Sequence, residues 1–376
     1  MKRKILYVAS TFSHIRNFHL PYLQAFTDRG WEVHVACGGP IQQLSQAERV
    51  VEIPFSKQMS FLKNKDAFLG LKRLLREEEY DLISTHTSLA SCFVRLAVAG
   101  MKHRPLVACM VHGYLFDEAT PLKNRVPLAA AEKVTASVTD LLLTMNHWDE
   151  EYARRHRLGK QVCNLPGIGV PFEKLDRVSR EDGLDLRRSY GLRGDQFVFV
   201  YAAEFSKRKS QETLLRAMTE LPEQVALVLA GQGELWEECR TLARSLNLEH
   251  RVIFPGQVRM PAWYAAADGA VSSSRSEGLP FNIMESMYLG LPVVATAVKG
   301  HEDLIVPEES GLLYPFGDSE ACARQMERLW KDPALCRRMG DKAHRDVARY
   351  GLEAVLPQVM QAYEGLLPLE EPVGVC

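Results

Sequence analysis

The sequence predicts an α/β protein with two Rossmann-like domains, each built on a doubly wound parallel sheet. Short apolar runs typical of buried strands alternate with amphipathic helical patterns along the whole chain. A segment rich in glycine and proline, 165–171, interrupts this alternation, and the pattern then restarts. The 376 residues are long for one hydrophobic core and sufficient for two. We therefore expect one domain at 1–166 and a second at 167–351.

The first half of the chain supplies the strands of the first predicted sheet. Strands are expected at 5–9, 32–36, 50–54, 82–86, 106–111 and 141–145, and helices at about 19–29 and 66–79. Ligands of doubly wound sheets bind beyond the carboxyl ends of the strands. His14, His86, His112 and Asn146 follow such strand ends and are therefore candidate site residues.

The second half repeats the alternation. Strands are expected at 196–202, 224–230, 252–254, 269–272, 293–296 and 311–314. Helices are expected at 211–220, from about 235 to 247, and at 261–267, 280–289, 319–330, 333–349 and 352–367.

Composition favours a globular protein of the cytoplasm. The chain is 46% hydrophobic and 25% charged, and no apolar window is long enough to span a membrane. The apolar run at 5–9 is too short for a signal peptide. The eight cysteines include no C-x-x-C pair, which favours a reducing compartment over a disulfide framework or a zinc site. The terminal residues 372–376 do not form a prenylation box.

Charge is distributed unevenly although the net charge is only −1. Residues 1–170 hold 22 Lys and Arg against 16 Asp and Glu, and residues 171–376 hold 24 against 31. A basic first half suits an anionic partner such as the inner membrane face or a lipid diphosphate, and the total is too low for general nucleic-acid binding. The segment 57–76 is an interfacial helix on anionic lipid or an ordinary covering helix. Its cations are Lys57, Lys63, Lys65, Lys72, Arg73 and Arg76.

The stretch 273–296 carries the most specific pattern. A loop containing Glu277 leads into a helix, with Pro280 expected as the first helical residue and Gly290 as its end. The helix start presents backbone N–H groups to an anion, and Glu285 lies within the helix. Carboxylates would repel a phosphate, so they are better suited to hold sugar hydroxyls beside it. The alternative is a well-capped helix with two exposed glutamates.

The full pattern S-x-x-E-G-x-P-x-x-x-x-E-x-M-x-x-G-x-P-V-V resembles the hallmark of retaining family-4 glycosyltransferases of the GT-B fold, in the bacterial exopolysaccharide and capsule branch. The resemblance implies two domains that face a central cleft, with helix 352–367 packed back on the first domain. It also implies that Glu277 contacts the donor sugar and that Glu285 holds the ribose of the nucleotide.

The same resemblance assigns other residues. Lys209 falls on the family lysine that binds the donor diphosphate, but the family's arginine position is Glu204. Arg208 and Lys207 are candidates for the missing cation, and a solvated basic turn is the alternative. His112, in the setting V-H-G-Y, resembles the family histidine that contacts the donor sugar, although a lone histidine is often structural.

Further donor-binding residues are implied by a G-x-G turn, an F-x-G-x-V element and the turn before the helix. They are Gly231, Gly233, Val258, Gly278, Leu279, Phe281 and Asn282. The first loop, 10–21, lacks the Gly-Gly pair of many family members and instead offers His14, Arg16 and Asn17. These three residues are expected either to recognise the acceptor or to lie on the surface without a role in binding.

The resemblance implies transfer of a hexose or N-acetylhexosamine from a UDP-sugar to a lipid-diphosphate-linked saccharide, with His112, Glu277 and Lys209 as catalytic residues. The sequence has no D-x-D pair and no metal-ligand spacing, so no metal cofactor is expected. Two alternatives stay open. A non-hydrolysing UDP-sugar 2-epimerase shares the fold, and a non-catalytic partner subunit is suggested by Glu204.

Overall fold

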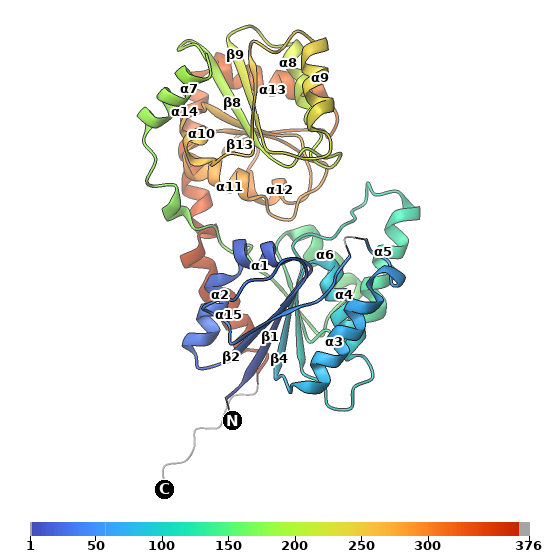
Figure 1. Ribbon diagram of the computed structural model, residues 1–376. Helices are drawn as coiled ribbons and strands as arrows, with labels where there is room; N and C mark the ends of the chain where they lie inside the picture. Colours follow the sequence, from blue (N-terminus) through green and yellow to red (C-terminus); the bar gives the residue numbers. More distant parts are fainter. Residues whose placement is uncertain (1, 57, 368–376) are drawn as a thin grey trace. The chain divides into compact units, whose positions relative to one another are not determined.

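The computed structural model describes residues 2–56 and 58–367, so Lys57 and the terminal residues 368–376 lie outside the described residues. The chain divides into two compact units (Figure 1). The first unit comprises residues up to Ile168 together with those from Val355 onward, and the second comprises Gly169–Ala354. The first division lies two residues beyond the boundary expected from sequence. Each unit contains one parallel sheet, which confirms the predicted α/β class.

The sheet of the first unit has seven parallel strands in the order β3-β2-β1-β4-β5-β6-β7. They are β1 (Lys4–Ala9), β2 (Glu32–Cys37), β3 (Arg49–Glu52), β4 (Leu82–His86), β5 (Leu106–Met110), β6 (Leu141–Thr144) and β7 (Gln161–Asn164). Strand order reverses between β1 and β4, which is where doubly wound sheets bind ligands. β7 was not predicted, because this short edge strand is only partly buried and lacks an apolar run.

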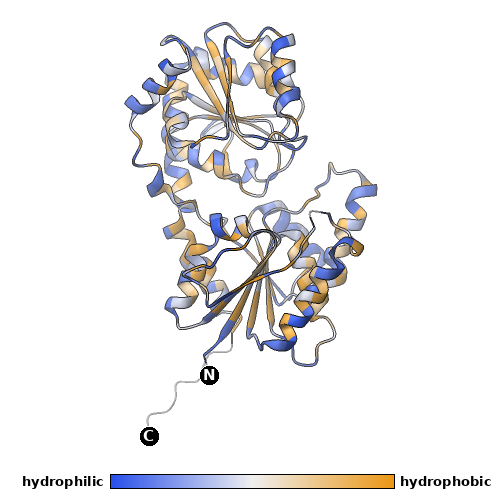
Figure 2. Cartoon of the chain, in the orientation of Figure 1, coloured by the Kyte–Doolittle hydropathy of each residue, from blue (hydrophilic) through white to orange (hydrophobic). Residues whose placement is uncertain are grey.

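Seven α-helices belong wholly or mainly to the described part of the first unit. They are α1 (Phe12–Phe18), α2 (Leu20–Asp28), α3 (Lys65–Glu77), α4 (Ser88–Val98), α5 (Leu122–Thr135), α6 (His147–His156) and α15 (Leu352–Glu364), with 3-10 turns at Leu62–Asn64 and Ala136–Val138. Helix α3 buries Leu71, Leu74 and Leu75 in the core cluster that it shares with α4 and the sheet. Figure 2 shows hydrophobic strands in both sheets and mixed hydropathy along α3. The face of α3 that carries these three leucines is therefore buried in the protein core.

The segment 10–21, which was predicted to be a loop, is mostly helical. It contains α1, which was not predicted, then His19 and the first residues of α2, the helix predicted from about 19. Phe12 and Ile15 lie about one turn apart and are both buried, and the Phe12 N–H donates to the Gly38 carbonyl at 2.8 Å. This correction places the candidate acceptor residues on a short helix.

Helix α15 is anchored to the first unit through Tyr363. The Tyr363 hydroxyl lies 2.7 Å from Ser84 Oγ, and its ring packs edge-on against Phe26 with centroids 5.4 Å apart. Arg29 forms an exposed ion pair with Glu364 at 2.9 Å. These contacts hold the C-terminal helix against β4 and the end of α2 in the first unit.

The sheet of the second unit has six parallel strands in the order β10-β9-β8-β11-β12-β13. They are β8 (Phe197–Ala202), β9 (Val225–Ala230), β10 (Val252–Gly256), β11 (Gly269–Ser272), β12 (Val293–Thr296) and β13 (Gly311–Tyr314). All six follow the predicted ranges to within two residues at each end. Fully buried apolar runs mark such strands clearly in a sequence.

The helices of the second unit surround this sheet (Figure 1). They are α7 (Arg180–Ser189), α8 (Gln211–Thr219), α9 (Trp236–Ser245), α10 (Pro261–Ala265), α11 (Phe281–Tyr288), α12 (His301–Leu304), α13 (Ser319–Lys331) and α14 (Pro333–Val347), with 3-10 turns at Phe172–Lys174 and Ala348–Tyr350. Helix α7 was missed because its sequence is mostly charged. A reciprocal capping box between Ser179 and Asp182 marks its start.

None of the helices in the described residues combines the length and the apolar content that a membrane span requires.

Candidate active site

The loops that follow β8, β9 and β10 pack tightly at the carboxyl edge of the second sheet. The Phe205 N–H donates to the Gln232 carbonyl at 2.9 Å. Gly231 has a φ of +138°, and a Cβ at this position would lie 2.0 Å from the Ala203 carbonyl oxygen. A Cβ on Gly233 would lie 2.3 Å from the Phe205 carbonyl oxygen. Both glycines of the G-x-G turn are therefore required for contact with the 203–209 loop.

The backbone of Lys209 is fixed to the loop that follows β11. Its carbonyl accepts hydrogen bonds from Ser273 Oγ at 2.8 Å and from the Tyr201 hydroxyl at 3.3 Å. The Tyr201 hydroxyl also lies 2.7 Å from Ser274 Oγ. The cationic loop and the loop that carries Glu277 are consequently held together by buried polar contacts.

Glu277 lies between two cations. Its carboxylate forms a short ion pair with the Lys209 ammonium and a second ion pair with the Arg208 guanidinium at 3.1 Å. The Glu277 and Lys209 side chains are 8% and 12% exposed, whereas Arg208 is half exposed. Burial by itself would raise the pKa of Glu277, but Lys209 and Arg208 outweigh this effect and lower it to about 2. Glu277 is therefore ionised at neutral pH.

The pKa of Lys209 is lowered by burial, and the attraction of Glu277 opposes that shift. The pair is charged, because the ionised Glu277 carboxylate stabilises the protonated Lys209 ammonium that it contacts. The depth of Lys209 argues against the solvated basic turn considered from the sequence.

The structure distinguishes between the two candidates for the second cation. Arg208 joins Lys209 at Glu277 and also donates to the Ser276 carbonyl at 3.1 Å. Lys207 is exposed and instead lines a pocket formed by residues of α8 and α9, such as Glu238. Of the two candidates, Arg208 is therefore the one that lies beside Lys209 and Glu277, and its role toward a diphosphate stays a prediction. Glu204 is exposed, and its carbonyl accepts a hydrogen bond from Gln211.

Glu285 has a different environment on the half-buried side of α11. Its carboxylate accepts a hydrogen bond from the Tyr264 hydroxyl at 2.9 Å. Burial raises the pKa of Glu285, although this hydrogen bond opposes the shift. The helix begins at Phe281, one residue later than predicted, because Pro280 is the extended N-cap. Gly290 has a φ of +73° just beyond the helix end, as expected for a stop.

The turn that carries Glu277 rests on a glycine that the sequence reasoning missed. Gly300 has a φ of +81°, and a Cβ there would lie 2.6 Å from the Gly278 carbonyl oxygen. The next residue, His301, is fully buried and hydrogen-bonded to Ser272 Oγ at 3.1 Å. Burial lowers the pKa of His301 and the negative charge of Glu277 opposes this. The sequence did contain a signal for this turn, because Gly300 closely follows the predicted strand 293–296.

The other predicted donor residues lie around the same edge of the second sheet. Leu279 is buried, and Phe281 and Asn282 are half-buried at the start of α11. The Asn282 carbonyl accepts a hydrogen bond from Ser286 Oγ at 2.7 Å. Val258 is half-buried in the loop after β10. Their roles in binding a donor stay predictions.

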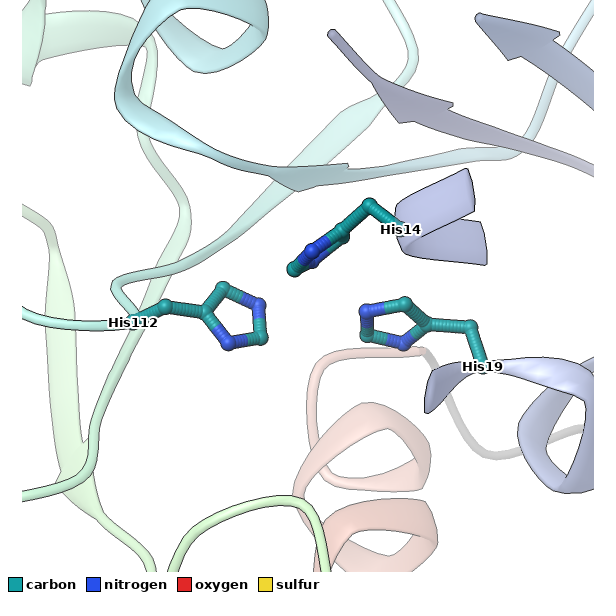
Figure 3. A group of neighbouring side chains, drawn as sticks. All are labelled: His14, His19 and His112. Carbon is teal, nitrogen blue, oxygen red and sulfur yellow. The ribbon is translucent and has the colours of Figure 1, made fainter. Parts of the chain in front are cut away.

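A cluster of four histidines lies at the carboxyl ends of β1, β4 and β5 in the first unit. The ring centroids of His14 and His112 are 4.7 Å apart, and those of His19 and His86 are 3.9 Å apart. His112 Nε2 lies 3.4 Å from His86 Nδ1. Figure 3 shows His14, His19 and His112 directed toward one common space.

The predicted acceptor residues separate on α1. The ring of His14 joins the histidine cluster, whereas Arg16 and Asn17 are exposed. Burial lowers the pKa of His14 to about 4. Burial, together with neighbouring imidazoles, also holds the pKa of His112 well below its ordinary value. These rings are therefore neutral at neutral pH and suited to hydrogen bonding.

The histidine cluster has a geometry that could hold a metal ion, which the sequence spacing did not indicate. That the protein needs no metal cofactor stays a prediction. One ligand atom from each of His14, His19 and His112 lies within 4.8 Å of the others. Sequence spacing missed the group because its members come from separate segments. Within 2–56 and 58–367, the carboxylates of Glu32 and Glu78 and the ring of His34 form a second such group. Both carboxylates already form ion pairs with Lys4.

Two Rossmann-like units, with a buried lysine–glutamate pair beside a glycine-lined turn at the strand ends of the second, are the architecture of a two-domain glycosyltransferase of the GT-B fold. The comparisons agree. Residues 22–162 match the family model described as "Glycosyltransferase Family 4", and residues 184–346 match "Glycosyl transferases group 1".

Similar proteins cover nearly the whole chain. The "Putative glycosyltransferase EpsD" of Bacillus subtilis (strain 168) is 33% identical over 98% of both chains. The "UDP-Gal:alpha-D-GlcNAc-diphosphoundecaprenol alpha-1,3-galactosyltransferase" of Escherichia coli is 24% identical over 86% of both. The structure of sucrose-phosphate synthase from Thermosynechococcus elongatus superimposes with a TM-score of 0.82, covering 97% of this chain and 99% of that one at 24% identity. The chain belongs to glycosyltransferase family 4 and is a glycosyltransferase.

Proposed function

We propose that the protein transfers a hexose or N-acetylhexosamine from a UDP-sugar, with retention of configuration, to a lipid-diphosphate-linked saccharide in surface polysaccharide synthesis. The observation that carries this proposal is the group formed by Arg208, Lys209 and Glu277 at the strand ends of the second sheet. The relative from Escherichia coli supports the donor and acceptor classes, because its name pairs UDP-Gal with a diphosphoundecaprenol-linked sugar.

The group has an excess of positive charge that fits a diphosphate. Two cations share one carboxylate, and Arg208 is half exposed and free to reorient toward a ligand. Each charged hydrogen bond from these cations to the donor diphosphate would contribute roughly 1.5–3 kcal/mol. Lys209 would also neutralise the charge that develops as the diphosphate departs, so we propose that transfer needs no metal ion.

The two glutamates would hold hydroxyl groups at different parts of the donor. Glu277 is ionised and therefore accepts hydrogen bonds from the transferred sugar, with no proton to donate. Glu285 would accept from the ribose hydroxyls, and Tyr264 keeps its carboxylate in one orientation. We assign His112 to the transferred sugar as well, with its neutral ring acting as a hydrogen-bonding group.

Retention without a protein nucleophile follows from front-face attack. The acceptor hydroxyl would form its bond to the anomeric carbon on the face from which the UDP oxygen leaves. The departing diphosphate takes the hydroxyl proton, so charge and atoms balance without an enzyme base. The protein then contributes by positioning and by stabilising the leaving charge.

An assay of UDP release tests the proposal. The purified protein is incubated with a panel of nucleotide-sugars, with and without a lipid-diphosphate saccharide extract. Glu277→Gln is compared with Glu249→Gln, which alters an exposed glutamate of the same unit. We expect acceptor-dependent UDP release that Glu277→Gln loses and Glu249→Gln keeps, with retained UDP binding as the check on folding.

Other outcomes identify the alternatives. Interconversion of the donor sugar without acceptor would indicate the 2-epimerase. UDP binding without turnover of any donor, even with the lipid extract present, would favour the non-catalytic partner subunit.

We also propose peripheral contact with an anionic membrane through the first unit. Phe61 and Leu62, just before α3, are 51% and 86% exposed, and the cations Lys63 and Lys65 lie close by in the sequence. Apolar side chains with adjacent cations suit the interface of anionic lipids. Sedimentation with vesicles of anionic and of neutral lipid tests this contact. A Phe61→Ser, Leu62→Ser double variant should lose binding to the anionic vesicles, and equal binding of both proteins would contradict it.

A further inference from the structure

The histidine cluster of the first unit has a chemical capacity that the transfer reaction does not require. His19 is fully buried, and neither of its ring nitrogens has a hydrogen-bond partner among the described residues. Nε2 of His14 likewise has none within the described part of the chain. Buried ring nitrogens of this kind are costly unless a ligand engages them. Their lone pairs are therefore available to a ligand that accepts electrons.

Geometry brings these two rings together with that of His112, although the three come from separate segments. His14 comes from α1, His19 from the junction of α1 and α2, and His112 from the loop after β5. One nitrogen of each lies within 4.8 Å of the others, and the rings converge in Figure 3. Tetrahedral zinc with N ligands at 2.0–2.1 Å needs nitrogens about 3.3 Å apart. Side-chain rotations that shorten each separation by up to about 1.5 Å would meet this requirement.

The chemistry of the donor set indicates which metals would fit. Imidazole is a ligand of zinc, copper, nickel and iron, whereas magnesium and calcium prefer oxygen ligands. Three imidazoles without a carboxylate favour zinc, copper, nickel or cobalt over magnesium or calcium.

An outer set of contacts would hold the ligands in place. The His86 ring stacks on Tyr7 with centroids 4.7 Å apart, and its Nδ1 lies 3.4 Å from His112 Nε2. Its Nε2 lies 2.9 Å from Ser84 Oγ, which is 2.7 Å from the Tyr363 hydroxyl. Outer contacts of this type orient metal-binding histidines and raise their affinity for metal. His86 is thus a positioning residue for the group.

We propose that His14, His19 and His112 form a binding site for a divalent transition-metal ion of the Zn²⁺ class, with three imidazole ligands and one position left for an oxygen ligand. The site shares His112 with the proposed contact to the donor sugar, but metal binding can be measured with no donor present. Its test therefore needs neither donor nor acceptor.

Cobalt and zinc titrations test the site. Untagged protein is first dialysed against a chelator, and Co²⁺ binding is followed by the visible absorption bands of the bound ion. Zn²⁺ affinity is then measured by competition with a chromophoric chelator. We expect one equivalent of Co²⁺ to bind and Zn²⁺ to displace it. His14→Ala and His19→Phe should each weaken binding at least about 10-fold.

The matched control is His103→Ala, which removes an exposed histidine that lies outside the group. It should bind Co²⁺ and Zn²⁺ as the unaltered protein does. Circular dichroism of each variant without metal verifies folding, and His14→Ala keeps the test open should His19→Phe fail to fold. Absence of Co²⁺ bands, or equal affinity in His14→Ala and His103→Ala, would overturn the proposal and leave the transferase proposal unaffected.

Discussion

Lys209 and Glu277 form a buried ion pair that joins the loop after β8 to the loop after β11. The contact links the residue expected on the diphosphate to the residue expected on the sugar. Arg208 adds a second, more exposed ion pair to the same carboxylate. If the donor binds here as proposed, its binding and the stability of the two loops would be coupled.

Replacing Glu277 with glutamine should destabilise the protein. The variant leaves the buried Lys209 ammonium without its anion, and breaking a buried pair in this way costs about 3 kcal/mol or more. Urea denaturation measures the free energy of unfolding, with Glu249→Gln as the exposed control. Adding UDP should recover more stability in Glu277→Gln than in the control, because the diphosphate replaces the missing negative charge. Equal stability of the two variants would argue against a strong pair.

The ion pair should also make stability depend on pH in the acid range. The pKa of Glu277 is about 2 in the folded protein, against 4.5 for an ordinary glutamate such as one in the unfolded chain. The contribution of Glu277 to the free energy of unfolding is therefore fully present above pH 4.5 and disappears as pH falls toward 2. The shift corresponds to about 3 kcal/mol.

The measurement compares the unfolding free energies of the unaltered protein and Glu277→Gln between pH 6 and the lowest pH at which both fold. Their difference should shrink as pH falls below about 4.5. A constant difference would mean that the carboxylate is not the group that titrates.

Substituting Gly231 with alanine should disturb the cationic loop. The new Cβ would lie 2.0 Å from the Ala203 carbonyl oxygen, and φ is already +138°. Strain of this kind costs about 1–3 kcal/mol, and moving the loop should weaken UDP binding as well. Gly194→Ala is the control, because a Cβ there meets nothing within 4 Å. Both variants are compared by urea denaturation and by calorimetry with UDP, and equal results would contradict the expectation.

Removing the Tyr264 hydroxyl should weaken nucleotide binding through Glu285. Tyr264→Phe loses the 2.9 Å hydrogen bond that orients the carboxylate. A net hydrogen bond contributes about 1 kcal/mol, so UDP affinity should fall about 5-fold. Tyr190→Phe, an exposed tyrosine of the same unit, should bind UDP normally. Unchanged affinity in Tyr264→Phe would remove Glu285 from the ribose site.

Much of the fold could be predicted because its signals are local. Apolar runs identified all six strands of the second sheet, and the pattern around Glu277 and Glu285 identified the family. The edge strand β7 and helix α7 were not predicted, because apolar residues do not recur at regular spacing in either of them. Helix α1 was taken for a loop, since its only internal signal is the pair of buried residues Phe12 and Ile15.

The sequence by itself determined the two parallel-sheet domains, the glycosyltransferase family and the separate candidate residues, because periodicity and motif spacing act over short stretches of chain. Only the tertiary structure decided which residues meet. Strand order brings His14, His19, His86 and His112 together, although nearly one hundred positions separate the first from the last. Packing between the loops after β8 and β11 likewise selects Arg208 over Lys207 as the partner of Glu277. Contacts of this kind depend on how the whole unit folds and which side chains it buries, and a local sequence pattern contains no information about either.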